Sequence, residues 1–165
     1  MVAQGGFVYL AGKEFLVVDA RNPTSPKVVG RYSTQGTATS LTISGTRAYL
    51  TLVSREGERW LRILNISDPT HPTRLGYLYP HDGLAIQVIG EQVYTVNGEK
   101  LYAIDVSQPL TPTVAATITT LAMVGRVAIL GNYAYVARGV FSDAVIIDLT
   151  KQEIINGGIG RWDVI

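Results

Sequence analysis

One strand motif recurs through the chain at intervals of about forty residues. Each copy has a glycine followed four positions later by a tyrosine, in the segments GGFVYLA from Gly5, GTRAYLT from Gly45, GEQVYTV from Gly90 and GNYAYVA from Gly131. Self-similarity at a period of 20 to 50 residues is the signature of a repeat architecture. The chain is therefore expected to fold as four copies of one supersecondary unit.

A second motif follows each first one and ends in an aspartate or asparagine. Its copies are FLVVDA with Asp19, LRILNI with Asn65, LYAIDV with Asp105 and AVIIDL with Asp148. After the first three copies come NPTSP, DPTHP and QPLTP. Proline has no amide hydrogen and cannot lie inside a paired ladder, so these segments predict turns between two strands.

Each unit has room for two further strands. KVVGRYS from Lys27 and TRLGYLY from Thr73 follow the proline turns, and TSLTIS, LAIQVI and GRVAIL lead into the next glycine. Four short strands per unit are typical of a propeller blade. We expect an all-β chain without helices, in which residues 1–165 form one β-propeller domain of four four-stranded blades.

The strand and turn segments also resemble a known family. LVVDARNPTSP, LRILNISDPTHP, AIDVSQPLTP and GNYAYVA are similar to LVIVD repeats. The resemblance implies a β-propeller and favours an extracellular or cell-surface location, while the compartment itself stays unassigned. Two departures are visible, because Asn65 replaces the usual aspartate and residues 151–161 lack the double-proline turn.

The two ends of the chain together resemble one innermost strand. DVI from Asp163 joined to MVAQGGFVYLA aligns with ATSLTISGTRAYLT. A propeller must close or leave exposed strand edges. Three alternatives remain open: a four-bladed ring closed by the split strand, two chains head to tail in an eight-bladed homodimer, or a segment of a longer propeller.

Composition excludes several classes of function. The chain has 14 basic and 13 acidic residues without a basic run, so nucleic acid is not an expected partner. No apolar run reaches the roughly 18 to 20 residues of a membrane span, and the N-terminus has no leader pattern, so membrane insertion is not expected. The absence of cysteine excludes disulfides and thiolate metal sites, and no cofactor or metal is expected.

Charged candidates gather in the loops that lead to the innermost strands and in the hairpins between second and third strands. His81 beside Asp82 is the one adjacent histidine and carboxylate pair, an arrangement that can orient a general base. However, neighbours on an extended chain point to opposite faces, which favours a solvated turn after Pro80.

Other candidates lie along the expected channel and its rim. Arg126 aligns with Ser40 and Ala85 in the innermost strand, so it could bind an anion in the channel, or form an intramolecular ion pair. Arg138 and Asp143 belong to the same loop face. Trp60 and Phe141 are candidate exposed anchors, with core packing as the alternative for Trp60.

Two recurring residue types are expected to be structural. The aspartates at strand ends, Asp19, Asp105 and Asp148, should accept hydrogen bonds from the backbone of their own turns. The tyrosines of the first motif should pack between blades because each lies in an apolar alternation.

No catalytic motif occurs, which favours a non-catalytic binding or scaffolding module that presents its loops to a protein or glycan partner. The alternatives are an enzyme of hydrolase or lyase type, with a small anionic substrate at the channel mouth, and a structural half-ring that associates with its own copy. In the enzyme alternative His81, Asp82, Arg126 and Arg138 would have to converge.

Overall fold

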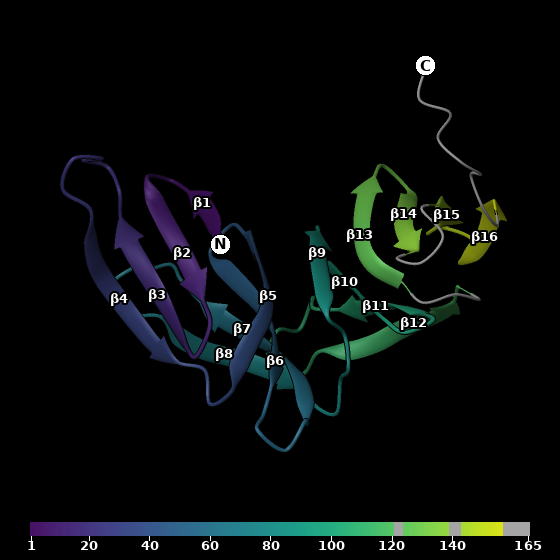
Figure 1. Cartoon of the computed structure of the whole chain (residues 1–165), viewed down its shortest axis with the longest axis horizontal. Coiled ribbons are helices and arrows are strands. Elements are labelled where there is room, and N and C mark those ends of the chain that lie inside the picture. Colours follow the sequence, from purple (N-terminus) through teal and green to yellow (C-terminus); the bar gives the residue numbers. More distant parts are fainter. Residues whose placement is uncertain (121–123, 139–142, 157–165) are drawn as a thin grey trace.

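Four antiparallel sheets make up the computed structural model, which describes residues 1–120, 124–138 and 143–156 (Figure 1). Each sheet has four strands in chain order and is one blade. Blade 1 contains β1 (Val2–Gln4), β2 (Phe7–Ala11), β3 (Glu14–Asp19) and β4 (Lys27–Ser33). Blade 2 contains β5 (Thr37–Ser44), β6 (Arg47–Val53), β7 (Arg59–Asn65) and β8 (Thr73–Leu78). Blade 3 contains β9 (Ala85–Ile89), β10 (Gln92–Asn97), β11 (Lys100–Asp105) and β12 (Thr113–Thr119). Blade 4 contains β13 (Val124–Leu130), β14 (Tyr133–Arg138), β15 (Asp143–Asp148) and β16 (Glu153–Asn156).

This arrangement confirms the predicted all-β class with four four-stranded blades. The described residues contain no helix, and hence none that could cross a membrane.

The blades share details of their backbone. The hairpin between the first and second strands turns at Gly45, Gly90 and Gly131, whose φ values of 56°, 56° and 58° are left-handed and suit glycine. In every blade the pairing of the third and outermost strands shifts by one residue just before the terminal aspartate or asparagine. Each blade is therefore the same unit, down to the position of its bulge.

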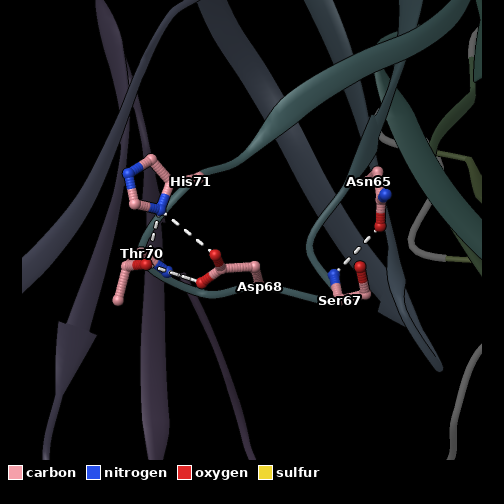
Figure 2. A network of polar contacts seen from close by, with 5 residues as sticks. All are labelled: Asn65, Ser67, Asp68, Thr70 and His71. Carbon is pink, nitrogen blue, oxygen red and sulfur yellow. Dashed lines mark hydrogen bonds and ion pairs between the residues drawn. The ribbon is translucent and has the colours of Figure 1, made fainter.

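The double-proline segments form the predicted turns. In blade 2, Asn65 Oδ1 accepts a hydrogen bond from the Ser67 backbone N–H (3.0 Å), and Asp68 Oδ1 accepts one from that of Thr70 (2.8 Å) (Figure 2). His71 Nδ1 lies 3.1 Å from Asp68 Oδ2. These bonds fix the turn before the chain enters β8.

The aspartates at the ends of the third strands have the predicted structural role. Each accepts a hydrogen bond from a backbone N–H two residues later: Asp19 from Arg21 (3.1 Å), Asp105 from Ser107 (2.8 Å) and Asp148 from Thr150 (2.9 Å).

Consecutive blades pack face to face, and each of the three joints has its own apolar cluster. Blades 1 and 2 meet through residues that include Tyr9 and Leu50, blades 2 and 3 through Tyr49 and Val93, and blades 3 and 4 through Val96 and Val145. The recurring tyrosines of the first three blades pack into these clusters, as predicted, with Tyr94 at the third joint.

The four blades form an open arc (Figure 1). Inner strands β1, β5, β9 and β13 follow one another along its inside, while blades 1 and 4 lie at opposite ends. Within the described residues, no apolar cluster joins blade 4 to blade 1. The described residues thus form an arc that is not closed into a four-bladed ring (Figure 1). Residues 163–165, which would complete the split strand, lie outside the described residues.

Candidate binding pocket between blades 2 and 3

A pocket of about 570 Å³ opens between blades 2 and 3. It lies on the loop face, which is the side formed by the linkers 34–36 and 79–84 and the hairpins 12–13, 54–58 and 98–99. Its lining comprises Gly57, Arg59, Pro80, His81, Asp82, Asn97, Tyr102 and Val114. The linker from β8 to β9 thus forms one wall, and strands of blade 3 form the other.

His81 is buried at the base of this pocket, with 4% of its surface exposed. Its Nε2 lies 2.8 Å from Thr95 Oγ1, and its ring meets that of Tyr102 edge-on at 5.2 Å between centroids. Its backbone N–H donates to the Arg59 carbonyl (3.0 Å), which fixes the linker against blade 2. Burial lowers the pKa of His81, an effect that the neighbouring Asp82 opposes, so the neutral imidazole is favoured.

The sequence interpretation of His81 as part of a solvated turn is wrong. The residue follows the outermost strand and points into the joint between the blades. Thr34 and Thr120 hold the corresponding places in blades 1 and 3 and are also buried, at 0% and 1% exposed. This position is therefore interior in three consecutive units, and blade 2 fills it with a larger, titratable side chain.

Gly83 lets the linker pass closely over the histidine. A Cβ at Gly83 would lie 2.6 Å from His81 Nε2 and 2.5 Å from Thr95 Oγ1. No real Cβ approaches so closely, which means that a side chain at this position would displace the imidazole.

Asp82 presents a carboxylate to the pocket. Its Oδ2 accepts a hydrogen bond from Asn97 Nδ2 (3.1 Å). Burial opposes its ionisation, but hydrogen bonds from Tyr102 and Asn97 outweigh burial and leave the pKa of Asp82 lowered. Burial and the bond to Asp82 raise the pKa of Tyr102 to about 12. At neutral pH the pocket therefore combines an anionic acceptor with a neutral phenol.

The other predicted site residues do not converge on this pocket. Arg126 is exposed on β13, on the opposite side of that strand from Val127 and Ile129, which pack against blade 3. Arg138 and Asp143 pair across β14 and β15, but their side chains lie outside the described part of the chain. Phe141 also lies outside it.

Trp60 is not an exposed anchor. It is 9% exposed and packs in the cluster between blades 1 and 2, where its ring lies 2.9 Å from a Cβ placed on Gly36. The core alternative is therefore the correct one. The reason is register, because Trp60 pairs with Leu52 inside β7 rather than extending the loop before it.

Sequence reasoning missed two residues, Tyr102 and Arg62, that share one position three residues before the terminal aspartate or asparagine. Blades 1 and 4 have Leu16 and Val145 there. An alignment of the four repeats could have revealed them. At this position it shows arginine and tyrosine in two blades and aliphatic side chains in the other two.

The fold and its repeats define the class of the protein, a β-propeller. The LVIVD repeat family matches residues 1–34, 35–78 and 123–149, which together are more than half of the chain. The protein belongs to the LVIVD repeat family.

Solved structures agree with this fold. The crystal structure of BamB from Moraxella catarrhalis, a β-propeller, superposes with a TM-score of 0.66 at 16% sequence identity. The match covers 94% of this chain and 47% of BamB, so the chain spans about half the length of that protein. At this identity the likeness concerns the fold alone. No curated protein matches the chain.

Proposed function

We propose that the chain is a non-catalytic, protein-binding propeller module, and that the pocket between blades 2 and 3 receives polar side chains of its partner. The supporting observation is that three residues of this pocket differ from the residues at the equivalent positions of other blades, and that all three lie together. His81 replaces threonine, Asp82 stands where blade 1 has Gln35, and Tyr102 replaces an aliphatic side chain.

Blade packing alone does not require this polar group. The joint between blades 3 and 4 uses Val145 at the position of Tyr102, and it buries an ordinary apolar cluster. The ionised carboxylate of Asp82, bonded to Asn97 and Tyr102, and the guanidinium of Arg59 in the same lining offer both signs of charge to a ligand. Such a set suits the mixed polar surface of a protein loop.

An enzymatic site has weaker support. His81 is only 4% exposed and its Nε2 is bonded to Thr95 Oγ1, which leaves little of the imidazole accessible to a substrate. The pocket lining contains no serine, cysteine or second histidine, and Arg126 faces elsewhere.

The test begins with a phage library of random 12-residue peptides selected on the immobilised chain, and an oligosaccharide array probed in parallel. The Kd of a selected synthetic peptide is then measured on the wild type and on the variants Asp82→Asn and Arg59→Ala. We expect a loss of at least about tenfold for each variant, as for removal of one charged contact to a ligand.

Lys27→Ala is the matched control, because Lys27 is an exposed charge at the opposite face. It should leave the Kd unchanged. Peptides that bind all four proteins equally, or an array on which only glycans bind, would contradict a protein-binding pocket.

A further inference from the structure

A proline turn of one blade docks against a glycine in the outermost strand of the preceding blade. In the first joint, a Cβ at Gly30 on β4 would overlap the carbonyl oxygen of Pro69 and approach Pro72 Cδ to 3.2 Å. In the second joint, a Cβ at Gly76 on β8 would overlap the carbonyl oxygen of Pro109 and lie 3.1 Å from Leu110 Cα. Both contacts involve backbone atoms, so only glycine fits.

The third joint lacks both partners of this contact. In blade 3 the outermost strand has Ala116 at the position equivalent to Gly30 and Gly76, as the pairing with the third strand shows. Blade 4 has no double-proline turn there, only the segment 149–152. Glycine and proline turn are thus present together in two joints and absent together in the third.

Blade 1 has its own double-proline turn, NPTSP, with Pro23 at the place of Pro69 and Pro109. Its adjoining sheet face is unpartnered. On β2 and β3, residues Val8, Leu10, Leu16 and Val18 alternate with those that pack against blade 2 and are only half-buried. On β4, Val28 pairs with Val18 and is 46% exposed. The turn and the apolar face together form the surface that blades 2 and 3 use to contact their predecessors.

The chain's own blade 4 does not match this surface. Asn156 on β16 pairs with Ile146 and so holds the position that Gly30 and Gly76 have in blades 1 and 2. At Gly30 and Gly76 only glycine leaves room for a proline carbonyl, and blade 4 has no glycine at this position.

We propose that the open face of blade 1 binds a propeller blade that has glycine at this position of its outermost strand, rather than blade 4 of a second copy. The partner is defined by its chemistry: a strand with a glycine gap that admits the Pro23 carbonyl, flanked by apolar side chains that cover Leu16 and Val18.

The first test supplies such a blade to the full chain. A copy of residues 35–85, which includes Gly76, is joined ahead of Met1, so that its linker leads into β1 as the original leads into β9. The matched control has the same graft with Gly76→Ala in the copied segment. We expect hydrogen-exchange protection of the β3 and β4 amides to rise at least about tenfold with the glycine graft and to stay near the ungrafted level with the alanine graft.

Equal protection from the two grafts would overturn the proposal, and so would a glycine graft that stays unfolded beside an intact blade 1. The second test is sedimentation equilibrium of the ungrafted chain, for which we expect the monomer mass of 17.9 kDa. A stable dimer that Val28→Asp dissociates would show that a second copy occupies this face, which would also overturn the proposal.

Discussion

Arg62 Nη1 donates a hydrogen bond of 2.7 Å to the hydroxyl of Tyr32 across the joint between blades 1 and 2. Arg62 is only 5% exposed, and its Nε has no hydrogen-bond partner among the described residues. The described part of the chain thus pairs this guanidinium with a tyrosine hydroxyl of the neighbouring blade.

Tyr32→Phe should destabilise the fold by about 1 to 3 kcal/mol, because it leaves a buried donor without its acceptor. The free energy of unfolding in urea measures this loss. Tyr77→Phe is the control and should change it little, since Tyr77 is 53% exposed. Combining Tyr32→Phe with Arg62→Leu should recover part of the loss, because blade 1 already has Leu16 at this position; a purely additive double variant would contradict the pairing.

Gly30→Ala and Gly76→Ala should each cost about 1 to 3 kcal/mol through overpacking against backbone. Gly12→Ala is the matched control, because a Cβ at Gly12 meets nothing within 4 Å. It should be neutral or slightly stabilising by restricting the unfolded chain. Thermal or urea unfolding of the three variants checks the order, and equal losses at all three glycines would refute the docking of the proline turns.

His81 should make stability depend on pH. Its pKa is lowered by burial below the ordinary 6.5, so the unfolded chain takes up a proton before the folded one does. Stability is then fully present above about pH 6.5 and falls on acidification, by up to about 1.4 kcal/mol per pH unit, until the folded pKa is reached. Unfolding free energies at several pH values between 5 and 8 measure the slope.

His81→Thr, which copies blades 1 and 3, should flatten this slope between the two pKa values even where it lowers stability overall. A slope that survives in His81→Thr would assign the effect to other groups.

Asp19 should have a pKa well below that of an ordinary exposed aspartate. Hydrogen bonds from Arg21, together with its charge, lower the pKa of Asp19 to about 2 from 3.8. Its contribution to stability is therefore present above about pH 3.8 and lost as the pH falls through about 2. NMR titration of the Asp19 side-chain carboxyl carbon measures the pKa, which Arg21→Ala should raise. Asp105, whose hydrogen bonds come from Ser107, is the internal control and should be unaffected by that substitution.

The repeat pattern predicted the fold well because spacing, glycine turns and proline turns are local properties. Strand order and the structural role of Asp19 followed from them directly. The arrangement of the blades did not follow from them, because it results from packing over whole sheet faces. Three ways of closing the propeller therefore remained open on the sequence alone.

The candidate site was predicted only in part. His81 and Asp82 were found, but the burial of His81 depends on Thr95 and Tyr102 from the next blade, which no local pattern reveals. The prediction of Trp60 as an exposed anchor failed for the opposite reason. The loop before it is charged, but Trp60 itself lies on β7 with its side chain in the core.

The position shared by Leu16, Arg62, Tyr102 and Val145 has a consequence for the assembly of the chain. Four nearly equivalent units could in principle stack in the wrong sequence or exchange places between molecules during folding. Arg62 donates to Tyr32 at the first joint, and Tyr102 meets the ring of His81 at the second, so among the described residues these two joints differ in their polar contacts. A mispaired stack would leave the buried Arg62 without its hydroxyl acceptor and His81 without its aromatic neighbour, so these contacts disfavour a wrong order of blades.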